Sequence, residues 1–110
     1  MKKLIFTLLA LVFYSTFITA QKCDTVLAKT YFQKGLELRK LRQLDSSIVY
    51  LNKAEIEYKK CNIIEKEIES SVLKARSYIN KKDEKSMELG YKISTDNLKK
   101  CNNFWKENHP

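Results

Sequence analysis

The sequence predicts an all-α protein made of antiparallel helical hairpins. Its 110 residues include only 2 glycines and 1 proline, too few for the turn about every 8 to 12 residues that a β-sandwich requires. Apolar residues recur instead at steps of three and four, which is the spacing of one helical face. The motif Lys59-Lys60-Cys61-Asn62 returns forty residues later as Lys99-Lys100-Cys101-Asn102, and Gln21-Lys22-Cys23-Asp24 is a weaker copy. A period of this length indicates stacked helical hairpins.

Residues 1–20 have the pattern of a secretory signal peptide. Lys2 and Lys3 precede an uncharged run from Leu4 to Ile18, and the small residue Ala20 precedes a polar stretch. These are the charged, apolar and cleavage regions of such a signal. We therefore expect cleavage after Ala20, export to the periplasm or the secreted space, and a helical domain over residues 21–110. The alternative is an uncleaved N-terminal helix that anchors the chain in the membrane.

The first repeat unit, about residues 23–60, is expected to form two helices. The first covers about residues 24–41, and the second begins after an N-cap at Asp45. One apolar or small face of the first helix consists of Val26, Leu27, Thr30, Tyr31, Gly35, Leu38 and Leu41. The matching face of the second consists of Ile48, Leu51, Ala54, Tyr58 and Cys61. Each helix has one such face, so we expect these residues to form the core.

The second unit, about residues 61–100, repeats this arrangement. Asn62 is expected to cap the third helix, and Asp83 the fourth, after a polar break at residues 80–82. The apolar face of the third helix consists of Ile64, Ile68, Val72, Ala75 and Ile79. That of the fourth consists of Met87, Tyr91, Ser94, Leu98, Cys101 and Trp105. The sequence thus predicts four helices with a shared core.

The spacing of small and large residues in both units resembles the tetratricopeptide repeat. That family has the pattern W-x2-L-G-x2-Y followed by A-x3-F, with small residues where two helices cross closely. In the first unit the glycine position is Gly35, and the other positions are filled by Tyr31, Leu38, Ser47, Leu51 and Ala54. In the second unit Ala75 takes the glycine position, followed by Tyr78, Met87, Tyr91 and Ser94. The resemblance covers residues 24–106, and the alternative is an unrelated four-helix bundle.

The resemblance implies a binding scaffold, because stacked hairpins of this family present a concave surface to peptides or protein segments. Carried over by position, this surface would consist of Lys29, Phe32, Gln33, Leu36, Arg39 and Lys40 on the first helix, with Arg76 and Ile79 on the third. Cations around apolar side chains would suit a peptide with an apolar anchor and an acidic neighbour. We therefore expect a protein-binding or peptide-binding scaffold of the bacterial envelope or secreted space. The alternative is a structural or sensor part of a larger repeat protein, or of a homo-oligomer such as a homodimer.

The charge is strongly basic, with 21 Lys and Arg against 13 Asp and Glu and a net charge of +8. The sequence has no nucleic-acid recognition motif, so we expect no nucleic-acid partner. Lysine pairs such as Lys59-Lys60 are typical of a solvated helical surface, and weak attraction to an anionic membrane surface is the alternative.

Enzymatic chemistry finds little support in the sequence. The single histidine, His109, stands beside the C-terminal Pro110, where a rigid catalytic triad could not be held. Metal-binding and phosphate-binding motifs and a nucleophile elbow are missing from the sequence. We therefore expect no enzyme activity, no cofactor and no metal.

The three cysteines carry the most specific chemistry. In an antiparallel hairpin the start of the first helix lies beside the end of the second, which brings Cys23 close to Cys61. Cys61 and Cys101 instead end parallel helices one repeat apart, too far for a bridge. We therefore expect a disulfide between Cys23 and Cys61 and a free thiol at Cys101; the alternative is three reduced cysteines that fill the core.

Overall fold

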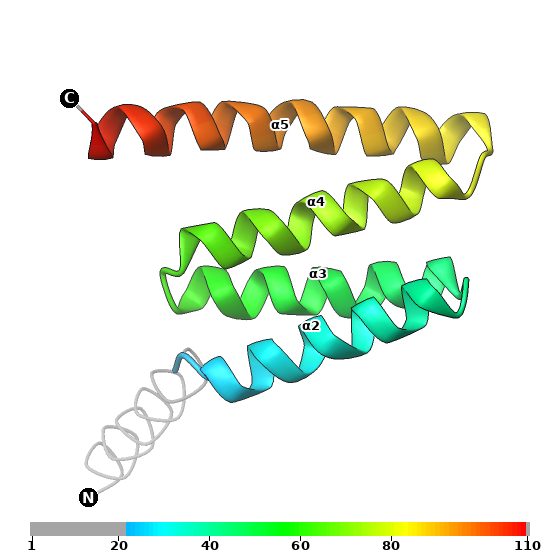
Figure 1. Cartoon of the computed structure of the whole chain (residues 1–110), viewed down its shortest axis with the longest axis horizontal. Coiled ribbons are helices and arrows are strands. Elements are labelled where there is room, and N and C mark those ends of the chain that lie inside the picture. Colours follow the sequence, from blue (N-terminus) through cyan, green and yellow to red (C-terminus); the bar gives the residue numbers. More distant parts are fainter. Residues whose placement is uncertain (1–21, 110) are drawn as a thin grey trace, which may run out of the picture.

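The computed structural model describes residues 22–109, and within this range the chain forms four helices and no strand (Figure 1). The helices are α2 (Thr25–Lys40), α3 (Leu44–Lys60), α4 (Ile64–Asn80) and α5 (Glu84–Asn108). The predicted all-α fold is therefore confirmed. The expected signal peptide over residues 1–20 lies outside the described residues.

The four helices form an open stack in chain order. Broad contacts join α2 to α3, α3 to α4, and α4 to α5. Figure 1 shows each helix running antiparallel to the one before it, with α5 at one edge and α2 beside α3 at the other. α2 and α5 share no broad contact, so these helices do not close into a four-helix bundle. Instead, the second hairpin packs through α4 on α3 of the first hairpin.

The three loops between these helices share one backbone geometry. Arg42, Asn62 and Lys82, twenty residues apart, adopt positive φ angles of 62°, 56° and 64°. In the first two loops, hydrogen bonds run from the amide of the next residue to a helix carbonyl five residues earlier: Gln43 N to Leu38 O, 2.9 Å, and Ile63 N to Tyr58 O, 3.1 Å. This is the Schellman ending, which satisfies the last carbonyls of a helix. All three loops between the helices have three residues, 41–43, 61–63 and 81–83.

The short loops overturn two of the three predicted N-caps. α3 starts after Gln43 and α4 after Ile63, neither of which makes a side-chain cap. Asp45 therefore lies inside the first turn of α3, and Asn62 is the left-handed loop residue. The predicted cap at Asp83 is confirmed, because its Oδ1 accepts a hydrogen bond from the amide of Ser86 at 2.8 Å.

The first hairpin has the main apolar core. Ala28, Phe32, Leu51, Ala54 and Tyr58 form one buried cluster. Two predicted core residues at the ends of α2, Val26 and Leu41, are exposed instead. α2 and α3 lie close together at one glycine, Gly35 of α2.

At Gly35 the backbone of α2 lies directly against α3. A Cβ on Gly35 would lie 2.7 Å from Leu51 Cγ, closer than two carbon atoms approach. Ser47 Oγ donates a hydrogen bond to Gly35 O at 2.8 Å. The predicted close approach of small residues in this hairpin is therefore present.

The packing of α5 on α4 in the second hairpin differs from the packing that the sequence predicts. Its glycine lies on the second helix: a Cβ on Gly90 would lie 2.6 Å from Ile79 Cγ1 and 2.8 Å from Ala75 O. Close approach at Gly90 turns the predicted core face of α5 away from α4. Tyr91, Leu98 and Trp105 are accordingly 57%, 63% and 62% exposed.

The residues of α5 that do face inward are small or polar. Ser86, Gly90 and Asn97 are its buried positions. The buried hydroxyls of Ser70 and Ser77 in α4 bond to carbonyls of their own helix at 2.8 and 3.1 Å. The second hairpin therefore relies on close backbone packing rather than on large apolar side chains. None of the helices within residues 22–109 is both long and apolar enough to cross a membrane.

Candidate binding site

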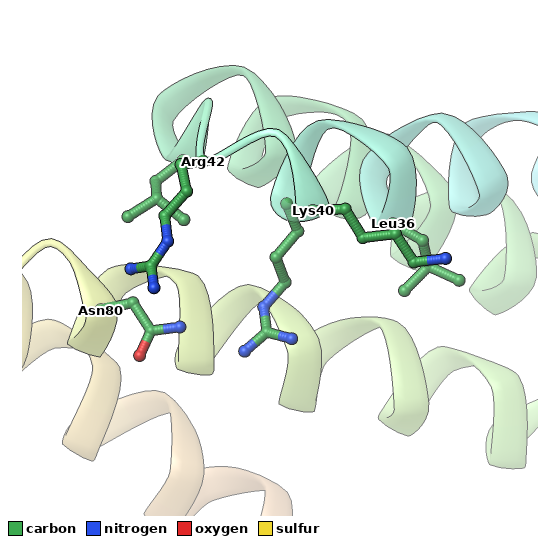
Figure 2. A pocket seen from close by; sticks show the side chains of 6 residues that line it. Leu36, Lys40, Arg42 and Asn80 are labelled. Carbon is green, nitrogen blue, oxygen red and sulfur yellow. The ribbon is translucent and has the colours of Figure 1, made fainter.

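A cationic pocket lies where the C-terminal ends of α2 and α4 meet the loop between α2 and α3. Its volume is about 310 Å³. The lining residues are Leu36, Arg39, Lys40, Arg42, Leu44 and Asn80. Figure 2 shows the side chains of Arg42 and Asn80 pointing toward one another across it, with Leu36 and Lys40 on α2. We call this feature the α2/α4 pocket.

The local backbone explains how the chain gathers these side chains. Leu36, Arg39 and Lys40 share one face of α2 because they are three and four residues apart. Arg42 follows the end of α2 in the left-handed conformation, and its amide donates to Arg39 O at 3.1 Å. The turn returns the chain to α3, which begins at Leu44. Three cations and two leucines therefore come from nine consecutive residues.

The cations of the pocket have no carboxylate partners. None of the ion pairs within residues 22–109 involves Arg39, Lys40 or Arg42. The Nε of Arg39 is shielded from solvent and has no hydrogen-bond partner there. Burial of a polar group without a partner costs free energy.

The dipole of α2 accounts for part of this charge. Cations in the last turn of a helix are stabilised by its C-terminal partial negative charge, and Arg39 and Lys40 lie in that turn. Arg42 follows the C-cap Leu41 and adds a third cation close to the same helix end. The pocket thus gathers three positive charges at the C-terminal end of α2.

An ion pair joins the elements behind the pocket. Lys81 Nζ lies 2.6 Å from Asp45 Oδ1, which links the start of α3 to the end of α4. This hydrogen bond is the main reason that the pKa of Lys81 is raised. The Asp45 side chain is largely exposed, so the pair adds little stability. Leu44 and Asn80, the neighbours of the paired residues, both line the pocket.

The residues of α2 that were predicted to form one binding surface lie in two separate places. Leu36, Arg39 and Lys40 come together in the α2/α4 pocket. Lys29 and Gln33 line a separate, shallow hollow on α2. The two groups therefore do not form one continuous groove.

Phe32 was expected on the binding surface, and this placement is wrong. Its side chain is only 6% exposed, and its ring packs edge to face on Tyr58 with centroids 6.5 Å apart. Lys66 Nζ of α4 lies 5.5 Å from the ring centroid. Phe32 therefore faces the core of the first hairpin rather than solvent.

The two residues expected from the third helix also lie elsewhere. Ile79 packs against Gly90 of α5, so its expected outward position is wrong. Arg76 is exposed but does not line the α2/α4 pocket. The pocket includes three residues that the sequence argument missed: Arg42, Leu44 and Asn80. The polar break after each helix could have indicated these three residues, because the loops at such breaks bring the ends of helices together.

The cysteine prediction agrees with the geometry. Cys23 and Cys61 are joined by a disulfide, with their Cα atoms 4.9 Å apart. Cys101 is the free, exposed cysteine of the described chain. The bridge fixes the start of α2 to the end of α3, at the opposite end of this hairpin from the pocket.

Comparison of the chain with protein-family models, with curated proteins and with solved structures gave no match.

Proposed function

We propose that this chain is a non-enzymatic, tetratricopeptide-like scaffold that binds an acidic protein segment or peptide in the α2/α4 pocket. The observation that carries the proposal is the group of three cations, Arg39, Lys40 and Arg42, without carboxylate partners around one pocket. Carboxylates of a partner would supply these missing acceptors. Arginine is well suited to this role because its planar group can hold a carboxylate through two parallel hydrogen bonds.

The apolar side chains of the pocket support a peptide rather than a free ion. Leu36 and Leu44 lie beside the three cations. A segment with one apolar residue next to aspartate or glutamate would bury the first on the leucines and pair the second with the arginines. The same reasoning selects a partner with opposite charge to this basic chain, which has a net charge of +8.

The compartment forms part of the same proposal. Disulfides persist in oxidising environments outside the cytoplasm, and Cys23 and Cys61 are placed for one. The signal-like pattern of residues 1–20 points the same way. We therefore propose that the scaffold works in the bacterial envelope or secreted space.

Peptide titrations test the proposal. Fluorescein-labelled short peptides with one leucine among aspartates and glutamates are titrated with the protein, and fluorescence anisotropy is measured. We expect Arg39→Ala and Arg42→Ala each to weaken binding about tenfold, since one charge-assisted hydrogen bond contributes about 1.5 kcal/mol. Added salt should weaken binding further because it screens the exposed charges.

Two controls separate site binding from general charge attraction. Lys59→Ala removes an exposed cation without an ion pair at the far end of α3, and it should leave the affinity unchanged. Matched peptides with asparagine and glutamine should bind much more weakly. Equal binding of the neutral peptides, or equal losses in Lys59→Ala and Arg42→Ala, would show that the pocket does not recognise an acidic segment.

A further inference from the structure

α5 has an apolar face that no other described element covers. Tyr91, Leu98 and Trp105 are 57%, 63% and 62% exposed, Cys101 between them is exposed, and Met87 lies at the start of the same line. These residues follow each other at steps of three, four or seven, so they form one stripe along the helix. We call the five residues the α5 face. Single exposed apolar residues are common, but a row of this length indicates an interaction surface.

The length of α5 extends this face beyond the rest of the stack. α5 has 25 residues, whereas α4, on which it packs, has 17. Lys100 pairs with Glu67 in the first turn of α4 at 3.6 Å, and Figure 1 shows α5 continuing past that end. Cys101 and Trp105 therefore lie on a part of the helix that projects from the stack.

The internal repeat shows that these positions hold core residues elsewhere in the chain. Forty residues before Tyr91 and Leu98 stand Leu51 and Tyr58. Both are buried in the core of the first hairpin. The α5 face thus has residues of core type without a covering helix, which is the expected condition of a surface that is covered on association.

The charges beside the α5 face indicate what covers it. Glu84 and Glu88 flank the face near the start of α5, and Lys99 and Lys106 flank the same side near its end. All four are exposed, and none belongs to an ion pair within the described range. An antiparallel copy of the same helix would place the acidic end of one beside the basic end of the other. In a parallel twofold pair this flank of the two helices would lie on opposite sides of the interface, so the four charges would not meet.

We propose that the α5 face binds α5 of a second copy of this chain, in antiparallel orientation about a twofold axis. Such an interface uses the same patch on both copies and closes as a dimer. With the face centred between Met87 and Trp105, Cys101 of one copy lies opposite Tyr91 of the other. The two Cys101 residues are then about 15 Å apart, from the rise of about 1.5 Å per residue. The dimer leaves the α2/α4 pocket free, so it does not depend on the proposed function.

Sedimentation equilibrium of the full chain, expressed with its own N-terminal segment, tests the dimer. We expect a monomer–dimer equilibrium that shifts with concentration. Reversing the acidic end (Glu84→Lys with Glu88→Lys) or the basic end (Lys99→Glu with Lys106→Glu) should raise the dissociation constant at least tenfold. The variant with all four reversals should dimerise like the wild type, because its charges are complementary again. Glu37→Lys, an exposed reversal on α2, is the matched control and should change nothing.

A cysteine pair tests the orientation and the register. Tyr91→Cys should form a covalent dimer with Cys101 of the second copy on mild oxidation, and adding Cys101→Ser should abolish it. Far-UV circular dichroism checks that each variant remains helical. A wild type that stays monomeric over the whole concentration range would overturn the proposal. So would a dimer that is unaffected by Leu98→Asp and by the charge reversals, or a wild type that cross-links directly through two Cys101 residues.

Discussion

Replacing Cys23 or Cys61 with serine is expected to lower the free energy of unfolding by about 4 kcal/mol at 25 °C. The two residues are separated by 38 positions in the sequence. In the chain-entropy relation, closing a loop of that length lowers the entropy of the unfolded chain by about 13 cal/mol/K. A domain of this size has about 5–15 kcal/mol of stability in all. The bridge therefore supplies a large share of it.

The structure indicates which part of the chain depends on the bridge. α2 lies at the edge of the stack and has broad contacts with α3 alone, and the disulfide fixes its first turn to the end of α3. Without the bridge we expect the start of α2 to fray first, because edge elements with few partners open most easily. Hydrogen exchange of the amides near Ala28 should become faster in the serine variants.

Urea and thermal unfolding followed by far-UV circular dichroism measure the effect. Cys23→Ser, Cys61→Ser and the double variant should unfold alike, with melting temperatures lowered by about 15–30 °C. Cys101→Ser is the matched control and should retain the wild-type midpoint. Wild-type protein should have one thiol per chain that reacts with a maleimide.

Two results would refute this reasoning. A loss below about 1 kcal/mol in both serine variants would mean that the bridge does not restrict the unfolded chain as the loop length requires. Three reactive thiols in protein purified from an oxidising compartment would mean that the bridge does not form.

Three further changes test the packing and the helix caps. Phe32→Ala should lower the free energy of unfolding by about 3 kcal/mol, because the buried ring would leave a cavity beside Tyr58; unchanged stability in a urea titration would place Phe32 outside the core. Gly90→Ala should destabilise by about 1 to 2 kcal/mol despite the better helix propensity of alanine, since its Cβ would lie 2.8 Å from Ala75 O; a higher melting temperature would argue against that close approach. The amide of Ser86 lowers the pKa of Asp83, so the Asp83 carboxylate contributes stability that is present above its unfolded pKa and lost as the pH falls through the lowered pKa. Asp83→Asn should therefore make the melting temperature less sensitive to pH below about pH 4, and parallel pH profiles of the two proteins would contradict this.

The sequence was sufficient for the number and type of the helices within residues 22–109. Periodicity at steps of three and four and the scarcity of glycine and proline depend on local backbone geometry, so they indicate helices before any packing is known. The cap at Asp83 follows from local chemistry as well. The pairing of Cys23 with Cys61 required only the antiparallel return of one hairpin.

The binding pocket was predictable only in part. Leu36, Arg39 and Lys40 share a helical face, which the sequence reveals directly. Arg42 and Asn80 reach the same pocket only because a left-handed turn and a neighbouring hairpin bring two helix ends together. A contact between residues this far apart in sequence depends on the stacking of hairpins, which no local pattern specifies.

The sequence by itself determined that α5 is a helix with an apolar stripe, whereas only the tertiary structure decided which way that stripe faces. The repeat pattern predicted Tyr91 and Leu98 in the core, but Gly90 is where the backbones of α4 and α5 come closest. Close packing favours the face with the smallest side chain, because a larger one would hold the helices apart. Phe32 is likewise buried because its ring packs on Tyr58 of α3. Periodicity identifies the faces of a helix, and the shape of the neighbouring helix selects the one that is buried.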